Sequence, residues 1–257
     1  AIRDHYLPVG SNDVVPKQPL SIVLALSEKI DYVTCLWKIG IKPTGNKDPF
    51  ALRRASLGII RIILENKLDI DLDYLIHLTK ANFDMSDLQL FLKDRIINYL
   101  TEKNYQKKVV EAVVRQYKLD FLPNLPIVIG EITEFISSEH GVRLLAVYKR
   151  VSNLLSSNKE FLSSKKKFSK QRATEEDKTL QKQLTLIKEQ VEESLQHKDF
   201  KKALLELGSI INPVNQFLDN VQVNCEDKDL RNLRYSLLNQ ISETTDSVVV
   251  FSELDKK

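Results

Sequence analysis

The spacing of hydrophobic residues predicts helices along almost the whole chain. Between Leu20 and Lys38, apolar residues recur every three or four positions, which is the period of one helix face. A second apolar series runs to about Asn66. We expect Asp48 to cap this second helix and Pro49 to occupy its first position, because both residue types favour helix starts. Its predicted buried side chains are Phe50, Leu52, Leu57, Ile60 and Ile63.

Helical patterns continue toward the C-terminal end. Thr174 and Asp177 form a T-x-x-D pattern, similar to a capping box, ahead of a helix that reaches about His197. The last helix should start near Glu226 and carry a leucine-rich stripe. No segment shows a convincing period-two alternation, so the sequence predicts an all-α fold. Further helices are predicted at about 71–80, from Ser86 to Leu100, and at about 105–118, 125–137, 139–157 and 199–209, with an interruption near Pro213.

Composition indicates an ordinary globular protein. The chain has 257 residues, of which 42% are hydrophobic and 28% are charged, with a net charge of +3. This small net charge does not itself indicate nucleic-acid binding, although local clusters can bind where the total does not. No apolar run approaches the roughly 18 residues of a membrane span. Cys35 and Cys225 are too few for a disulfide framework, so we expect a reducing cytoplasm. The start, which lacks Met, suggests part of a longer protein.

The segment from Gly40 to Arg54 resembles a phosphate-binding loop only at first sight. Gly45 is followed by Asn46 before Lys47, whereas a P-loop needs Gly-Lys-Ser/Thr after its four-residue gap. The preceding segment is also predicted to be a helix rather than a strand. A tight connection between two helices explains the glycines and the proline better. It leaves unexplained a group of cations, which consists of Lys42, Lys47, Arg53 and Arg54.

Three other basic groups are candidates for binding nucleic acid. The segment 156–173 is rich in Ser and Lys and is predicted to be a linker or loop, with Lys165, Lys166 and Lys167 at its centre. Cations interleaved with aromatic rings suit a phosphate backbone and unstacked bases, but a solvated loop has the same composition. The second group is Lys149, Arg150 and Asn153. The third is Arg231, Arg234 and Tyr235, predicted to lie away from the leucine stripe; surface salt bridges are the alternative explanation for its arginines.

Catalytic and metal-binding patterns are absent from the sequence. The four histidines are scattered, and none has a second histidine at ligand spacing. The sequence contains no G-x-S-x-G and no H-E-x-x-H motif. We therefore predict no catalytic residue, no metal site and no cofactor in this chain.

Three segments together resemble one protein family. They are K-P-T-G-N-K-D-P-F-A-L-R-R-A-S-L-G, L-L-A-V-Y-K-R-V-S-N-L-L and N-C-E-D-K-D-L-R-N-L-R-Y-S-L-L-N-Q-I, in that order. They are similar to the beta subunit of the bacterial two-subunit glycyl-tRNA synthetase, and T-G-x-K-D-P-F-A-L-R-R is its most specific string. H-Y-L-P near the start extends the resemblance along essentially the whole chain.

This resemblance implies a domain organisation. Residues 1–80 would be the C-terminal part of an HD-like helical domain, whose A-L-x-x-K-x-D segment matches Ala25, Leu26, Lys29 and Asp31. Residues 81–257 would be a helical body and a DALR-like anticodon-binding domain. The chain lacks a His-Asp dipeptide, so these residues cannot assemble an HD-type phosphohydrolase site.

The resemblance also implies a function. The beta subunit would recognise tRNA-Gly through its anticodon region, so that the alpha subunit can attach glycine in an ATP-dependent ligation. ATP and Mg²⁺ would be used by the alpha subunit, in a heterotetramer of two alpha and two beta subunits. We expect the basic groups above to contact tRNA. Of Arg53 and Arg54, we expect one to lock the corner between two helices by pairing with Asp48 or Asp31, and the other to face tRNA phosphates. The alternative function is a helical scaffold that mainly docks the alpha subunit.

Overall fold

The structure, a computed structural model, describes residues 1–10, 12–79, 84–158 and 173–254. It divides into two compact units, Ala1–Ile127 and Val128–Lys257. All regular elements within the described ranges are helical, apart from one isolated bridge between Thr44 and Lys47, so the predicted all-α fold is confirmed. None of the described helices is both long and apolar enough to cross a membrane.

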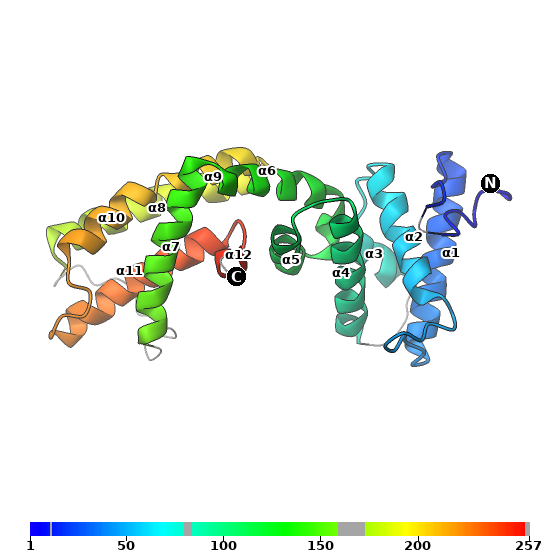
Figure 1. Cartoon of the computed structure of the whole chain (residues 1–257), viewed down its shortest axis with the longest axis horizontal. Helices are drawn as coiled ribbons and strands as arrows, with labels where there is room; N and C mark the ends of the chain where they lie inside the picture. The colour runs from blue at the N-terminus through cyan, green and yellow to red at the C-terminus, as the bar shows by residue number, and fades with distance from the viewer. Residues whose placement is uncertain (11, 80–83, 159–172, 255–257) are drawn as a thin grey trace. The chain divides into compact units, whose positions relative to one another are not determined.

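Unit 1 is built around helix α2. This helix lies between α1 and α4, and it packs against both (Figure 1). Its fully buried side chains include Leu52, Ile60 and Ile63, as the apolar spacing predicts. The helices of unit 1 are α1 (Pro19–Lys38), α2 (Leu52–Glu65), α3 (Leu72–Leu78), α4 (Met85–Glu102), α5 (Lys107–Gln116) and the 3-10 helix η1 (Leu119–Asn124).

The start of α2 differs from the prediction. The helix begins at Leu52 rather than at Pro49, because Ala51 has a left-handed backbone with φ of 53°. Asp48 still satisfies the helix end, since its carboxylate oxygens accept hydrogen bonds from the backbone N–H groups of Leu52 (2.8 Å) and Arg53 (3.0 Å). Phe50 precedes the helix and is 45% exposed, so its predicted burial was wrong.

We expect Asp48→Ala to lower the free energy of unfolding by about 1–2 kcal/mol, because two N–H groups at the helix start would lose their partner. Urea unfolding followed by circular dichroism measures this change. Asp31→Ala is the matched control, since Asp31 is exposed and caps no helix. Equal stability of the two variants would contradict the capping role of Asp48.

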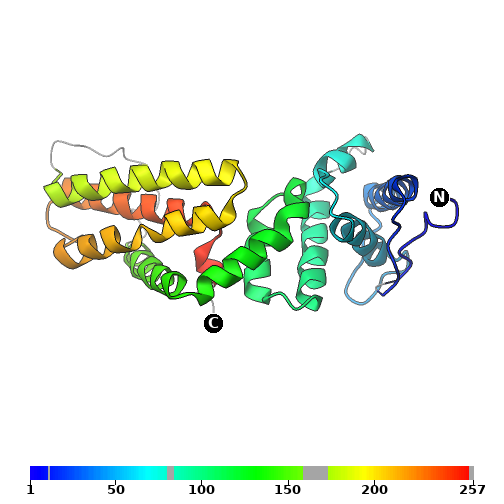
Figure 2. The ribbon, with the colours of Figure 1, turned by 90° about the horizontal axis from the view of Figure 1, so that it is seen from above.

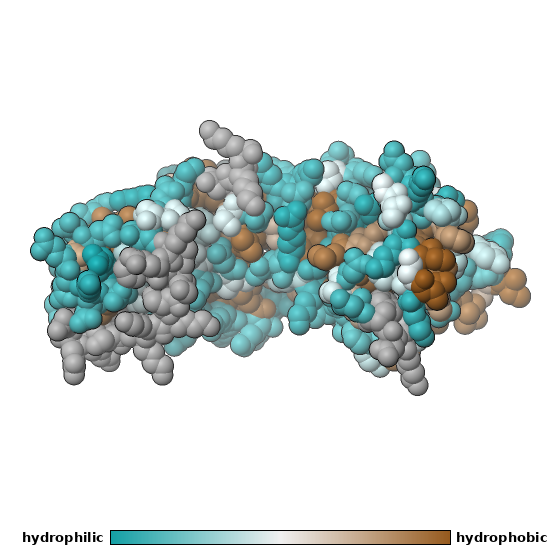
Figure 3. Space-filling view, turned by 90° about the horizontal axis from the view of Figure 1, so that it is seen from below, coloured by the Kyte–Doolittle hydropathy of each residue, from teal (hydrophilic) through white to brown (hydrophobic). Residues whose placement is uncertain are grey.

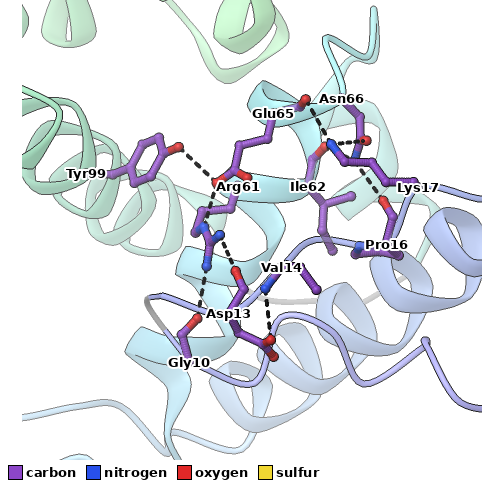
Figure 4. A network of polar contacts seen from close by, with 10 residues as sticks. All are labelled: Gly10, Asp13, Val14, Pro16, Lys17, Arg61, Ile62, Glu65, Asn66 and Tyr99. Carbon is purple, nitrogen blue, oxygen red and sulfur yellow. Dashed lines mark hydrogen bonds and ion pairs between the residues drawn. The ribbon is translucent and has the colours of Figure 1, made fainter.

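A buried arginine attaches the N-terminal loop to α2. Arg61 is 6% exposed and donates hydrogen bonds to the backbone oxygens of Gly10 (2.9 Å) and Asp13 (2.5 Å), as Figure 4 shows. Its Nε also donates to Glu65 Oε1 at 2.7 Å, and Tyr99 of α4 donates to the same oxygen at 3.2 Å. This network connects the loop, α2 and α4.

Two of the residues that match the HD-like segment, Lys29 and Asp31, differ in burial and in hydrogen-bond partners. Lys29 is 7% exposed, and its ammonium group donates to the backbone oxygen of Tyr6 at 3.0 Å. Burial, against the opposing effect of Glu28, lowers the pKa of Lys29. Asp31 is exposed and accepts a hydrogen bond from Cys35. Lys29 therefore holds the H-Y-L-P segment against α1.

Unit 2 is a helical bundle in which α8 and α11 run side by side (Figure 2). Helix α8 packs against α9, α10 and α11, and α7 packs against the same three helices. The predicted capping box is confirmed, because Thr174 and Asp177 exchange hydrogen bonds at the start of α8. The elements are α6 (Leu125–Ser137, which spans the division between the units), α7 (Glu139–Ser157), α8 (Glu175–Gln196), α9 (Phe200–Gly208), α10 (Ile211–Asn220), α11 (Lys228–Asp246) and α12 (Phe251–Leu254).

The predicted domain boundary near residue 80 does not coincide with the division at Ile127. The reason is that α4 and α5 pack into unit 1: α4 contacts α2, and α5 contacts α4. The helical stretches after residue 80 therefore complete the first compact unit. The assignment of the first 80 residues to an HD-like domain stays a prediction.

Candidate nucleic-acid interface

Helix α7 presents polar side chains on the face opposite its core. Lys149, Arg150 and Asn153 are exposed, whereas Val147 and Val151 are buried. The helix starts at a Ser138 cap, whose hydroxyl accepts a hydrogen bond from the backbone N–H of Gly141 at 3.1 Å. Apolar residues at helical spacing then direct one face into unit 2, which leaves the three predicted residues outside.

Arg150 is tied to α10 by two contacts. Its guanidinium donates to Asn215 Oδ1 and to Asp219 Oδ1, both at 2.7 Å. The side chains of Arg150 and Asp219 are 45% and 62% exposed, so this is a surface ion pair. Such pairs contribute about 0–1 kcal/mol. Lys149 and Asn153 lie one helical turn apart and are also exposed.

Arg234 lies in the interior, so its predicted position away from the leucine stripe was wrong. It is 7% exposed, and its Nε donates to Asp177 Oδ1 at 3.2 Å. Its Nη1 donates to the backbone oxygen of Gln222 at 2.7 Å. The arginine therefore joins the start of α8 to the loop before α11.

Tyr235 is also an interior residue, and its predicted surface position was wrong. The side chain is fully buried, and its hydroxyl donates to Asn224 Oδ1 at 2.7 Å. Asn158, just after α7, donates to the same hydroxyl at 2.6 Å. Tyr235 thus connects the end of α7 with the loop before α11.

The position of α11 explains both corrections. Every residue from Leu233 to Leu238 is buried, because α7 and α8 both pack against this helix. A single leucine stripe predicts only one buried face, whereas a helix packed on two sides buries nearly its whole circumference. Arg231, one turn earlier, is half-buried, and its Nη1 donates to the backbone oxygen of Cys225 at 3.3 Å.

Sequence reasoning missed three residues of this cluster: Asp177, Asn158 and Asn224. Asp177 was identified only as a helix cap, although it is also the fully buried partner of Arg234. No sequence signal indicates the role of either asparagine, because their contacts with Tyr235 join positions 77 and 11 residues apart.

In unit 1, the predicted cations of the corner have different surroundings. Lys42 pairs with Asp87 of α4, and its Nζ lies 5.3 Å from the centre of the Trp37 ring. Lys47 is exposed in the turn that closes with Thr44. Lys42 therefore connects the corner to α4, whereas Lys47 faces solvent.

The two adjacent arginines, Arg53 and Arg54, also have different surroundings. Arg53 donates from Nη2 to the backbone oxygen of Gly45 at 2.6 Å, so it braces the corner through a carbonyl. Arg54 is exposed. The predicted pairing of either side chain with Asp48 or Asp31 was wrong, since no such ion pair exists between these described residues. Lys165, Lys166 and Lys167 lie outside the described residues.

Within the described ranges, no group of three or more His, Cys, Asp or Glu side chains is suited to hold a metal ion. What the described residues offer is polar and cationic surface on helices. That surface can bind an anionic partner.

Comparison with protein families gives two matches on this chain. Residues 1–115 match the model described as the glycyl-tRNA synthetase beta subunit, and residues 144–248 match the DALR anticodon binding domain. The chain belongs to the glycyl-tRNA synthetase beta-subunit family. The second match falls inside unit 2, where it covers most of α7 and all of α8, α9, α10 and α11.

Individual relatives are similar over nearly the whole chain. The glycine–tRNA ligase beta subunit of Paracoccus denitrificans (strain Pd 1222) is 33% identical over 258 residues, covering 99% of this chain and 38% of the relative. The beta subunit of Rickettsia conorii (strain ATCC VR-613 / Malish 7) is 39% identical over 259 residues, with the same two coverages. That of Janthinobacterium sp. (strain Marseille) is 35% identical over 269 residues, covering 99% and 37%. The chain therefore spans less than two fifths of the length of these relatives.

Proposed function

We propose that this chain is the tRNA-recognising part of a glycyl-tRNA synthetase beta subunit, and that unit 2 binds the anticodon region of tRNA-Gly. The observation that carries the proposal is the match of residues 144–248 to the DALR anticodon binding domain, over helices that form one compact unit. The relatives named glycine–tRNA ligase beta subunit support glycine as the amino acid.

The residues of the interface have different roles in this proposal. Lys149 supplies a positive charge for a backbone phosphate, and Asn153 supplies an amide that can bond to RNA bases or riboses. Arg231 contacts RNA from the start of α11. Arg234 and Tyr235 act from the interior, where they hold α7, α8 and the loop before α11 in place. Lys165, Lys166 and Lys167 stay in the proposed set of phosphate contacts.

The chemistry of ligation belongs to the alpha subunit in this proposal. That subunit activates glycine with ATP and Mg²⁺ and transfers it to the tRNA, which the beta subunit holds. The complete enzyme is a cytoplasmic heterotetramer of two alpha and two beta subunits. This chain contributes binding and orientation of the RNA.

One observation favours the alternative function, a scaffold that docks the alpha subunit. Helix α1 exposes apolar side chains at helical spacing: Leu20 is 65% exposed, Val23 59% and Leu24 41%. Figure 3 shows hydrophobic surface gathered at the end of unit 1 that carries α1. Contiguous exposed apolar surface often marks a protein–protein contact.

Fluorescence anisotropy with labelled tRNA-Gly tests the proposal. We expect tighter binding to the native anticodon than to a substituted anticodon, and an affinity that falls as salt rises, because phosphate contacts release counterions. Lys149→Gln should weaken binding roughly 3–10-fold and reduce the salt slope by about 1. The matched control is Lys188→Gln on α8, which removes one exposed positive charge from the same unit.

One result would contradict the proposal, and a second would remove a single residue from it. Weak binding that is equal for both anticodons would favour the scaffold, in which case the chain should bind purified alpha subunit without RNA. Equal affinities of Lys149→Gln and Lys188→Gln, with native anticodon preference retained, would remove only Lys149 from the interface.

A further inference from the structure

A cationic pocket lies between α2 and α4 in unit 1, at a distance along the chain from the interface on α7. It has a volume of about 400 Å³. Three arginine side chains line it, together with one carboxylate, one amide, one tyrosine, one leucine and Gly10 of the N-terminal loop. The charged, amide and leucine side chains of this lining are Arg53, Arg54 and Leu57 of α2 and Arg95, Asn98 and Glu102 of α4.

Within the described ranges, the guanidinium groups of this pocket have no carboxylate partner. Arg53 donates only to the backbone oxygen of Gly45, at 2.6 Å. Arg54 makes no hydrogen bond or ion pair with any residue that the structure describes. Three positive charges therefore share the pocket with the single carboxylate of Glu102.

Arg95 provides an independent sign of a missing ligand. Its Nε is buried and has no hydrogen-bond partner within the described ranges. The guanidinium carbon lies 5.7 Å from the centre of the Phe91 ring, which holds the side chain in place without using its N–H donors. A buried donor without a partner costs about 1–3 kcal/mol, so native proteins usually supply one.

We propose that this pocket binds a phosphate group, and that the group is a backbone phosphate of the tRNA bound by unit 2, so this inference rests on the proposed function. Guanidinium forks match the oxygens of a phosphate, and a phosphate would relieve the repulsion among like charges. Asn98 is exposed beside Arg95 and adds an amide donor. Leu57 provides an apolar wall, which strengthens the charge interactions. Inorganic phosphate offers the same chemistry from a second source.

The test compares variants of the 257-residue chain. Arg54→Gln and Arg95→Gln should each weaken tRNA-Gly binding roughly 3–10-fold and reduce the salt slope by about 1, as expected for one lost phosphate contact. The matched control is Lys108→Gln on α5, which removes an exposed charge from the same unit and should not change affinity. Because Arg54 is exposed, its variant keeps the fold even if Arg95→Gln unfolds, which circular dichroism would reveal.

A second measurement separates the two phosphate sources. Inorganic phosphate at millimolar concentration should shift the ¹⁵Nε signal of Arg95 in the wild-type chain and not in Arg54→Gln. If Arg54→Gln binds tRNA as tightly as the control Lys108→Gln does, and phosphate still shifts the ¹⁵Nε signal of Arg95 in the wild-type chain, the site takes free phosphate instead of RNA.

Two outcomes would overturn the inference in distinguishable ways. If Arg54→Gln and Arg95→Gln bind tRNA like Lys108→Gln and phosphate causes no shift, the pocket is not a phosphate site, whereas loss of affinity in Lys149→Gln would leave the proposed function standing. If the wild-type chain shows no salt-dependent tRNA binding, the proposed function fails, and the ¹⁵Nε titration alone then decides whether the pocket binds phosphate.

Discussion

Arg234→Ala should lower the free energy of unfolding by about 3–5 kcal/mol, because it removes one partner of a buried ion pair and leaves the other charged. Asp177 is fully buried, and the arginine side chain is 8% exposed. The variant would also leave the backbone oxygen of Gln222 without its donor. Urea unfolding at neutral pH, followed by circular dichroism, measures the loss.

Two further variants show whether the pair is responsible. The double variant Asp177→Asn with Arg234→Met should recover part of the stability lost in Arg234→Ala, since it buries no uncompensated charge. Lys182→Ala on α8 is the control, because this lysine is exposed and should change stability by no more than about 0.5 kcal/mol. A loss below about 1 kcal/mol in Arg234→Ala would show that the ion pair does not anchor α11.

This result also bears on tRNA binding. A reduced affinity of Arg234→Ala alone cannot identify an RNA contact, because the variant loosens the helices that carry Lys149 and Arg231. A binding assay at a temperature where the variant stays folded separates the two effects. The exposed Lys149 is the better probe of direct contact.

Arg61→Met should destabilise the chain by roughly 3–5 kcal/mol, because Arg61 is a buried cation that holds a loop and a carboxylate at the same time. The variant would leave the backbone oxygens of Gly10 and Asp13, and the carboxylate of Glu65, without their donor. Urea unfolding measures the loss. In Arg61→Met, the increase in hydrogen-exchange rate relative to wild type should be larger in the N-terminal loop than in α4.

Lys17→Met is the control for Arg61→Met. Lys17 is exposed and also links the loop to α2, through the backbone oxygen of Glu65 (3.3 Å) and Asn66 Oδ1 (3.0 Å). Its loss should cost less than about 1 kcal/mol, since exposed polar contacts contribute little. If both variants were equally stable, the buried position of Arg61 would not matter.

Acid should reduce the difference between wild type and Arg61→Met. Burial acts to raise the pKa of Glu65, but the hydrogen bond and charge of Arg61 outweigh it and hold that pKa below its usual value. A carboxylate with a lowered folded-state pKa stabilises the fold above its unfolded pKa of about 4.3 and loses that contribution as pH falls through the folded value. The stability gap should therefore shrink below about pH 4.

Local patterns in the sequence predicted most of the helices. The T-x-x-D pattern at Thr174 predicted a real capping box, and the predicted helix at 139–157 has the observed bounds of α7. Such features depend on contacts within a few residues, which the sequence contains directly. The start of α2 was predicted three residues too early, because the left-handed backbone of Ala51 delays the helix after Pro49.

The candidate site was harder to predict, because the charge of a residue does not indicate whether its side chain is buried or faces solvent. Arg231, Arg234 and Tyr235 lie close together in sequence, yet Arg234 and Tyr235 are buried and Arg231 is half-buried. Arg54 and Arg95 are far apart in sequence but line one pocket. Only the packing of α2 against α4, and of α11 between α7 and α8, decides which cations are buried with interior partners and which face solvent.

The sequence by itself therefore determined the all-α class, the capping signals and the resemblance to the beta-subunit family, since each depends on residue type and short spacing. The tertiary structure decided that Arg61 and Arg234 are interior anchors, that Arg53 braces a corner, and that Arg54 and Arg95 share an open pocket. The physical reason is that burial and partner choice depend on residues brought together from distant parts of the chain, whose contacts no local pattern specifies.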